Sequence, residues 1–296
     1  MAPIPAQQVG YCLGEWLEGV EPQNDRGPVK FTKAIESQVD KLCLGNAGQY
    51  TMFSPITQDK LKTIGHLRNT HHKGLRFMYL NHEQALIAKI MLSELHELFH
   101  REFAYMCREK AAMMGLGHEL RDVGGRTFQG VSSRKEPDTA FKHSSHPLES
   151  NWPTMVIECG ISESIRHLKV DSRWWLVNSL GEVKIVFLIS VSKPARRIHI
   201  EQWEIATVQN PQRIRGNPHD FVTRPTKVHE VDIAGLVALA PAVPAPAGPA
   251  PVVTGAPLTL DFDKIFLRQP HQREGNIILT AQDLGRYAFD VWPFIQ

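Results

Sequence analysis

Two acidic residues lie beside apolar segments, where a charged side chain needs a partner. Asp138 follows a proline in the stretch KEPDTAF (135–141), and Glu158 ends the apolar run 155–157. A proline and a glycine bound that run, which is typical of a buried strand. Burying a carboxylate is costly unless it is paired or binds a cation. Two acids on adjacent strands therefore predict a divalent-metal site.

The order of the expected elements places both acids on one sheet. A long amphipathic helix is expected over 82–113, with Asn81 as its cap and Glu83 in its first turn. Strands are expected at 126–131, around Asp138 and at 155–157. A second helix is expected from Ser162, and further strands at 183–191 and 197–205. A helix between two strands implies a parallel crossover, and short turns imply antiparallel pairing. The predicted fold class is α/β: a mixed β-sheet flanked by helices on both faces, with an α-β-β-β-α-β core.

Composition divides the chain into four parts. Residues 1–74 are expected to form a helical or irregular N-terminal extension, and 75–237 the core domain. Residues 238–256 are rich in proline and alanine and predict a semi-rigid linker. The segment 257–296 is too short to be stable alone, so we expect it to dock on the core, with a closing helix at 281–292.

Composition also limits the class of protein. The 296 residues carry a formal net charge of +2, so nucleic-acid binding would have to come from a local basic patch. The four cysteines form no CxxC pair, which favours a reduced intracellular location, nuclear or cytoplasmic, over secretion. The first residues lack the pattern of a signal peptide, and no run of about 18 apolar residues predicts a membrane span.

These motifs together resemble the PD-(D/E)XK phosphodiesterase superfamily, which has the restriction-endonuclease-like fold. The phrases KEPDTAF, WPTMVIECGISES, LKVDSRWWL, VKIVFLIS and IHIEQW are similar to a fungal branch of it, mostly uncharacterised. The phrase NHEQAL matches the position of the glutamate in that branch's first helix. The resemblance covers residues 75–206 well and 257–292 weakly.

The resemblance implies a metal-dependent nuclease-like phosphodiesterase that acts on nucleic acid, with DNA favoured over RNA. Asp138 and Glu158 would hold one or two Mg²⁺ or Mn²⁺ ions, and Glu83 would complete the ligands. The metal would polarise the scissile phosphate and lower the pKa of an attacking water. A lysine near the second acid would stabilise the developing charge.

The chain departs from the family pattern at this lysine. The family places it two residues after the second acid, where this chain has Gly160. Lys169, at the edge of the apolar face of the second helix, is the candidate replacement, and Lys135 and Lys184 are weaker candidates. If no lysine reaches the acids, the alternative is a catalytically inactive nuclease-fold module that serves in binding or interaction.

A second alternative comes from the run HELFH. His96 and His100 have the spacing of the HExxH zinc-protease motif, with Glu97 between them. In such a motif the two histidines bind zinc and the glutamate activates a water molecule. A third zinc ligand is not evident further along the chain. The run therefore predicts a zinc protease less strongly than the acids predict a nuclease.

A basic segment supplies candidates for contacts with nucleic acid. The polar stretch 209–227 is expected to be a loop, and it carries Arg213, Arg215 and Lys227. Cationic side chains on a loop can bind phosphates without reading the base sequence. These three residues are the predicted nucleic-acid contacts.

Overall fold

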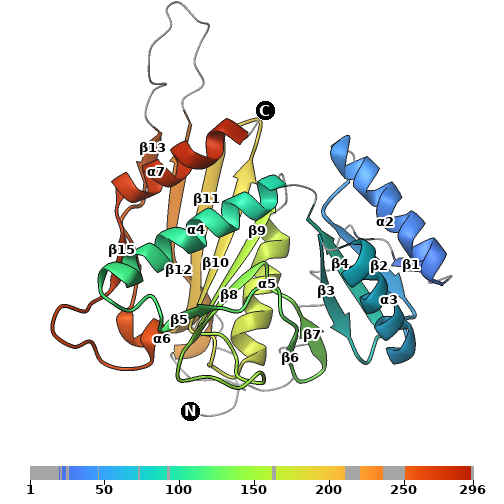
Figure 1. Cartoon of the computed structure of the whole chain (residues 1–296), viewed down its shortest axis with the longest axis horizontal. Helices are drawn as coiled ribbons and strands as arrows, with labels where there is room; N and C mark the ends of the chain where they lie inside the picture. The colour runs from blue at the N-terminus through green and yellow to red at the C-terminus, as the bar shows by residue number, and fades with distance from the viewer. Residues whose placement is uncertain are drawn as a thin grey trace, which may run out of the picture.

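A computed structural model of the protein describes most of the chain as two large sheets and their helices (Figure 1). Sheet A has six strands in the order β1-β2-β4-β3-β7-β6, and sheet B has seven in the order β13-β12-β11-β10-β9-β8-β5. The described residues are 20, 22–24, 27–45, 47–72, 74–91, 94–161, 165–210, 221–235 and 251–294.

Sheet B contains the predicted core. Its strands are β5 (Leu120–Asp122), β8 (Thr139–His143), β9 (Met155–Ile161), β10 (Ile185–Ser192), β11 (Arg197–Gln209), β12 (Phe221–Ala234) and β13 (Val252–Thr254). Strands β9 and β10 are parallel and are joined by α5 (Ile165–Asn178), whereas the other neighbours in the sheet are antiparallel. With α4 (Glu94–Met113) in front, the order α4-β5-β8-β9-α5-β10 confirms the predicted mixed sheet and its α-β-β-β-α-β core. The first strand of this core is β5, whereas the strand predicted at 126–131 corresponds to β6 (Phe128–Gln129) and lies in sheet A.

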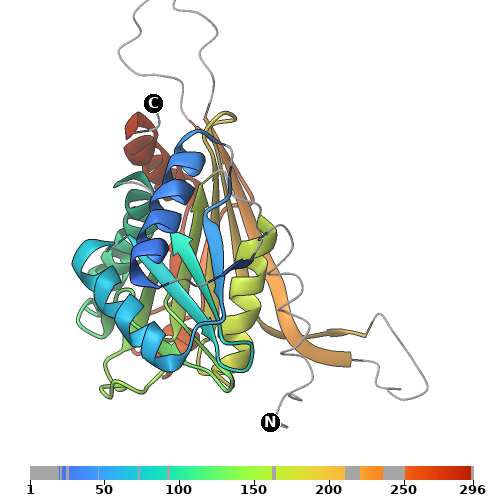
Figure 2. The same cartoon turned by 90° about the vertical axis from the view of Figure 1, so that its right-hand side faces the viewer.

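Helices cover both faces of sheet B. On one face, α4 and α7 (Ala281–Val291) pack on alternate residues of the strands in a large apolar cluster. On the other face lies α5, whose tryptophans belong to a second cluster. Figure 2 shows the sheet edge-on between α5 and the pair α4 and α7. Residues buried on both faces explain why the central strands are almost continuously apolar.

The C-terminal segment is part of the same core. It consists of β14 (Leu258–Leu260), α6 (Phe262–Phe266), β15 (Ile277–Leu279), α7 and the short 3₁₀ helix η2 (Trp292–Phe294). Its buried side chains, including Phe262 and Trp292, lie in the cluster that also contains Phe99 of α4. The segment therefore contributes to the stability of sheet B.

Sheet A packs beside α5 and carries helices on its outer side. Its strands are β1 (Pro22–Asn24), β2 (Tyr50–Ser54), β3 (Leu75–Leu80), β4 (Ala85–Ile90), β6 (Phe128–Gln129) and β7 (Ser133–Lys135). Side chains of β2, β3 and β4 join the tryptophans of α5 on one face, and α2 (Pro28–Cys43) and α3 (Gln58–His71) cover the other. The sheet thus spans the predicted boundary at residue 75.

The predicted helix over 82–113 is wrong in its first third. Residues 81–84 form a turn, Gln84 has a positive φ of 47°, and Ala85–Ile90 is strand β4. The apolar run in this segment fits a helix or a buried strand equally well. Pairing with β2 on one side and β3 on the other decides for the strand, and the helix begins at Glu94.

The predicted loop over 209–227 is also partly wrong. Strand β12 begins at Phe221 and pairs with β11 along its whole length, so Lys227 lies on a strand. Arg213 and Arg215 lie outside the described residues. The distal part of this hairpin is largely exposed, so it lacks the apolar alternation that identifies a strand in a sequence.

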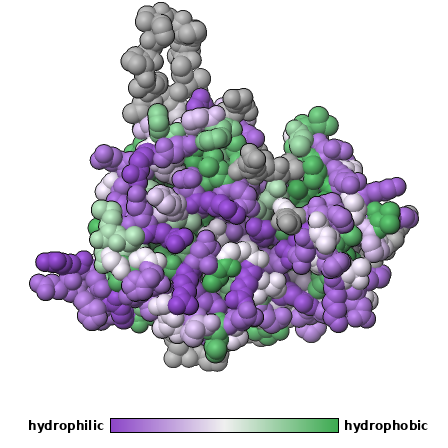
Figure 3. Space-filling model, viewed as in Figure 1, coloured by the Kyte–Doolittle hydropathy of each residue, from purple (hydrophilic) through white to green (hydrophobic). Residues whose placement is uncertain are grey.

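The face of the molecule drawn in Figure 3 is mainly hydrophilic. Its apolar side chains lie in separate patches, as is usual on surfaces that face water. None of the described helices is both long enough and apolar enough to cross a bilayer.

Candidate active site

The two predicted acids meet at one buried lysine that the sequence analysis did not select. Lys89 Nζ, from β4, lies 2.6 Å from Asp138 Oδ2 and 3.2 Å from Glu158 Oε2. The side chains of both acids are 0% exposed, and that of Lys89 is 4% exposed. Two carboxylates and an ammonium thus converge from three separate segments of the chain.

A second buried lysine extends the cluster. Lys135, at the end of β7, places Nζ 2.5 Å from Asp171 Oδ1 and 3.5 Å from Glu158 Oε1. Asp171 comes from α5 and also accepts a hydrogen bond from the Tyr50 hydroxyl at 3.1 Å. The buried site therefore contains three carboxylates and two ammonium groups, and sheet A supplies both of the ammonium groups.

Hydrogen bonds fix the orientation of both predicted acids. The backbone N–H of Cys159 donates to Asp138 Oδ2 at 2.7 Å, which ties the start of β8 to β9. Trp175 of α5 donates its indole N–H to Glu158 Oε1 at 2.7 Å. A carboxylate that accepts such bonds is held in one rotamer, so these donors preorganise the site.

The charged residues of the stretch KEPD have separate partners. Lys135 and Asp138 enter the buried cluster, whereas Glu136 forms a bidentate ion pair with Arg68 of α3 at 2.8 and 3.0 Å. Glu136 also accepts the backbone N–H of Phe77. This short segment therefore joins α3, sheet A and the acids of sheet B.

The histidines of the HELFH run lie directly behind Asp138. His96 Nε2 lies 2.9 Å from the carbonyl oxygen of Cys159, and His100 Nδ1 lies 2.7 Å from the Thr139 hydroxyl. Burial, the largest cause, lowers the pKa of His96 to about 4 and that of His100 to about 3. Both rings are therefore neutral at pH 7 and are engaged in the packing of α4 on sheet B.

Burial and the neighbouring cations have opposite effects on the pKa of each acid. For Asp138, burial is the largest influence and acts to raise the pKa, but the Lys89 ammonium, its hydrogen bond and the neighbouring His96 and His100 together hold the pKa below its usual range. For Glu158, burial and the nearby Asp171 outweigh Lys135 and raise the pKa to about 7. Lys89 stays charged, because its two carboxylates overcome the effect of burial and raise its pKa. Unequal pKa values within an acid pair are typical of functional sites and of buried ion networks.

A narrow pocket reaches the two lysines from sheet A. Its lining includes Arg76, Lys89 and Lys135, together with the acidic Glu136. Each of the three cationic side chains is in an ion pair with a carboxylate, so an anion such as a phosphate oxygen would compete with these carboxylates. The pocket's volume of about 10 Å³ leaves room for roughly one water molecule.

The donor atoms of the acids fit a divalent cation in type. Asp138 Oδ1 is buried and accepts no hydrogen bond from the described part of the chain, although such an oxygen normally has a partner. Carboxylate oxygens are the ligands that Mg²⁺ and Mn²⁺ prefer. Asp138 and Glu158 are therefore the residues that would hold such an ion, beside the ammonium of Lys89.

Glu83 does not belong to this cluster. The structure places it in the exposed turn between β3 and β4, whereas the prediction assumed the first turn of a helix. Lys89, further along the same segment, is the residue that β4 brings to the acids. The loss of the expected helix thus removes the reason for including Glu83 among the metal ligands.

Of the three lysines that the sequence offered as partners of Glu158, the structure brings only one to it. Lys169 lies on α5 with Nζ 3.4 Å from Glu201 of β11, not beside Glu158. Lys184 donates to the carbonyl of Gly181. Lys135, one of the two weaker candidates, does reach Glu158, and Lys89 of β4 reaches both acids.

Lys227, the predicted nucleic-acid contact within the described residues, is already paired. Its Nζ lies 2.5 Å from Glu230 and 3.6 Å from Glu201. Glu230 is its neighbour on β12, so the ammonium is directed at the sheet surface. A phosphate would have to compete with two carboxylates for this lysine.

One signal in the sequence points to Lys89. The segment ALIAKI contains a single charge in an otherwise apolar run, and all six residues are buried. A lysine in such a strand needs a buried carboxylate as its partner. The assignment of this segment to a helix hid that signal.

Comparisons with known proteins do not assign a family to the chain. No family model matches it, and no curated protein matches it. One similar solved structure is a candidate nuclease of the DUF820 family from Anabaena variabilis, with 15% identity and a TM-score of 0.33. The match covers 46% of this chain and 81% of that one, and likeness at this level is too distant to assign a function.

Proposed function

We propose that the chain is a metal-dependent phosphodiesterase of nuclease type that acts on nucleic acid. The observation that carries the proposal is the convergence of Asp138, Glu158 and the ammonium of Lys89 within hydrogen-bond distance. This is the residue set that phosphodiester hydrolysis of this type needs, drawn here from three different segments. The mixed sheet that holds the acids also supports the proposal.

The residues would divide the work as follows. Asp138 and Glu158 would hold Mg²⁺ or Mn²⁺, and that ion would supply a polarised phosphate and a water of lowered pKa. Lys89 stays protonated and would stabilise negative charge that develops on the phosphate. Lys135 balances Glu158 and Asp171, and Trp175 orients Glu158.

A second candidate function is a nuclease-fold module without catalysis. Two observations favour it: the acids are 0% exposed, and Lys89 already lies between them, where it balances their charge. The pocket beside Lys89 holds about one water molecule, so a phosphodiester would reach the buried acids only after the structure around them opens. The chain would then act through binding alone.

Cleavage assays separate the two candidates. The full chain is incubated with plasmid, single-stranded DNA and RNA, with Mn²⁺ or Mg²⁺ and with a chelator. We expect metal-dependent cleavage, reduced at least 100-fold in Asp138→Asn and in Glu158→Gln. Lys169→Gln is the matched control, because Lys169 is paired with Glu201 and lies outside the acid cluster.

Two results would reject the proposal. Cleavage that persists in both acid variants would assign the activity to a contaminant or to another site. The absence of cleavage on all three substrates, from a protein that unfolds cooperatively on heating, would favour the module without catalysis. Unfolding curves of each variant show whether a loss of activity reflects a loss of structure.

A further inference from the structure

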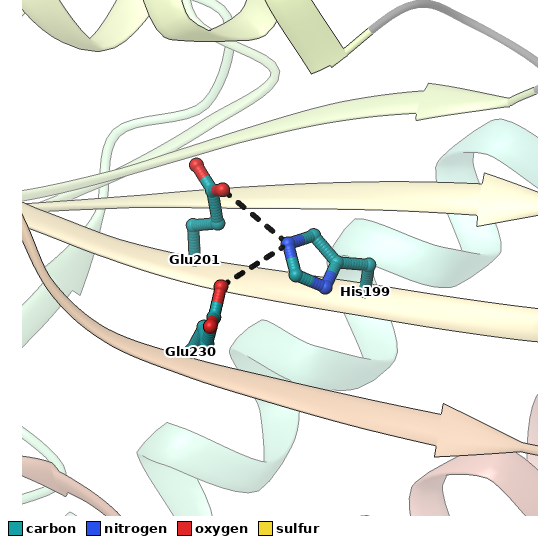
Figure 4. Close-up of side chains that lie close together, drawn as sticks. All are labelled: His199, Glu201 and Glu230. Atoms are coloured by element: carbon teal, nitrogen blue, oxygen red, sulfur yellow. Dashed lines mark hydrogen bonds and ion pairs between the residues drawn. The ribbon is translucent and has the colours of Figure 1, made fainter. Parts of the chain in front are cut away.

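A second group of metal-ligating side chains lies on β11 and β12. His199, Glu201 and Glu230 each offer one ligand atom, and these atoms all lie within 4.8 Å of one another. Figure 4 shows the imidazole of His199 between the two carboxylates, with Nε2 directed at both. The group combines nitrogen and oxygen donors, which suits first-row transition metals better than Mg²⁺.

The spacing of these atoms is close to that of a tetrahedral site. His199 Nε2 lies 3.3 Å from Glu201 Oε1 and 3.9 Å from Glu230 Oε2. Ligands about 2.1 Å from a tetrahedral Zn²⁺ ion lie about 3.4 Å from each other. Small rotations of the exposed Glu230 side chain would bring all three atoms to that spacing.

A second carboxylate fixes the tautomer of the histidine. His199 Nδ1 lies 2.9 Å from Asp232 Oδ1, and Arg197 holds the same oxygen at 2.7 and 2.8 Å. With Nδ1–H donating to Asp232, Nε2 is the ring nitrogen that would bind a metal ion between Glu201 and Glu230, in place of the proton that it donates to Glu201. A carboxylate on the far nitrogen of a histidine is the usual support of a metal-binding imidazole, and it is independent of the ligand set itself.

Two lysines balance the acids of this group. Lys227 Nζ lies 2.5 Å from Glu230 and 3.6 Å from Glu201, and Lys169 Nζ of α5 lies 3.4 Å from Glu201. The Lys227 side chain is 37% exposed, so it can turn into solvent when a cation binds. Glu201 is 2% exposed and is held by an indole N–H of Trp203 at 2.8 Å, so it stays in place.

We propose that His199, Glu201 and Glu230 form a binding site for a borderline divalent cation of the Zn²⁺ class, with Lys227 as its internal competitor. The ion would tie β11 to β12, and Asp232 would position His199. The proposal does not depend on the phosphodiesterase function. Glu158, Leu188, Glu201 and Glu230 lie in one row across the sheet, so the two groups share a face of sheet B two strands apart.

The test uses Zn²⁺ and the full chain carrying Cys43→Ser, because Cys43 is an exposed thiol that would bind zinc on its own. Binding is measured by competition with a chromophoric chelator at pH 7.5. We expect one Zn²⁺ per chain, bound at least tenfold more weakly in His199→Gln and in Glu230→Gln. Lys227→Gln should bind several-fold more tightly, since its competing ammonium is gone.

Controls separate this site from the rest of the chain. His229→Gln is the matched control: His229 is the neighbour of Glu230 on β12, faces the opposite side and bonds the carbonyl of Gly255, so binding should not change. Zn²⁺ should raise the melting temperature of the parent and of Lys227→Gln, because a ligand of the folded state stabilises it.

Several outcomes would overturn the proposal. Equal affinity for Zn²⁺ in the parent, His199→Gln and Glu230→Gln would show that the ion binds at another site. Weaker binding in Lys227→Gln would show that this lysine is not a competitor. Glu230→Gln, whose side chain is 51% exposed, should fold and so keeps the test decisive.

Discussion

Lys89 and Asp138 form a fully buried ion pair between the two sheets of the molecule. The ammonium lies 2.6 Å from Asp138 Oδ2 and 3.2 Å from Glu158 Oε2, although 49 and 69 residues separate these partners in the chain. The pair joins β4 of sheet A to the start of β8 in sheet B. It therefore bears on stability as well as on the proposed chemistry.

Removal of the Lys89 ammonium should be strongly destabilising. Lys89→Met leaves two carboxylates without this cation, and breaking a buried pair costs about 3–5 kcal/mol. Lys89→Met/Asp138→Asn should recover part of that loss, because one uncompensated charge is gone. Urea unfolding at pH 7 measures both.

The matched control for Lys89 is an exposed pair. Lys62 lies 3.6 Å from Asp59, and their side chains are 81% and 94% exposed. Lys62→Met should change the free energy of unfolding by less than about 0.5 kcal/mol. If Lys89→Met were equally mild, the buried cluster would not hold the two sheets together.

The neighbouring tryptophans of α5 provide a paired test of the hydrogen bond to Glu158. Trp175 donates to the Glu158 carboxylate at 2.7 Å, whereas Trp174 donates to the Ser133 hydroxyl at 2.8 Å. Trp175→Phe should cost about 1–3 kcal/mol more than Trp174→Phe, because a buried carboxylate loses a donor and a hydroxyl can find another partner. Equal losses in urea unfolding would show that ring packing, not the hydrogen bond, dominates.

The raised pKa of Glu158 should oppose folding as the pH increases. Burial raises the pKa from 4.5 to about 7, so the folded state keeps a proton that the unfolded chain loses. This contribution to stability is complete below pH 4.5 and is lost as the pH rises to about 7, which amounts to about 3 kcal/mol. In Glu158→Gln this loss should be absent, and comparing unfolding free energies of the two proteins at pH 4.5 and 7.5 measures it. Parallel pH profiles would contradict the assignment.

The buried histidines of α4 should have the opposite effect. Burial lowers the pKa of His96 from 6.5 to about 4 and that of His100 from 6.5 to about 3. A lowered pKa stabilises the fold above pH 6.5, and this stability is lost as the pH falls, by about 2 kcal/mol per histidine at pH 5. His100→Gln should therefore lose less stability than the parent between pH 7 and pH 5.

The control for this prediction is His118→Gln, because His118 is exposed. The free energy of unfolding of this variant should change between pH 7 and pH 5 by the same amount as that of the parent. Guanidinium unfolding at several pH values provides the data. A profile of His100→Gln that falls as steeply as the parent would show that the ring is protonated in the folded state.

The sequence by itself determined the arrangement of the central elements. The apolar run before Glu158, the helix after it and the strand at 185–192 follow from periodicity and β-branched residues, because these segments are buried on both sides. The proximity of Asp138 and Glu158 was also predictable, since Asp138 directly precedes β8 and Glu158 lies on the neighbouring strand β9. Local sequence patterns are sufficient to predict an element where its secondary-structure propensity and its pattern of buried residues indicate the same structure.

Only the tertiary structure decided which cations meet these acids. Lys89 lies in a segment whose pattern fits a helix or a strand, and pairing with β2 and β3 selected the strand that turns it toward Asp138. Lys169 lies beside Glu201, because α5 packs against β11 as well as β9 and β10, and periodicity does not specify which strands a helix covers. Contacts between residues this far apart in the chain depend on how the sheets pack, and one sequence carries no local signal for that packing.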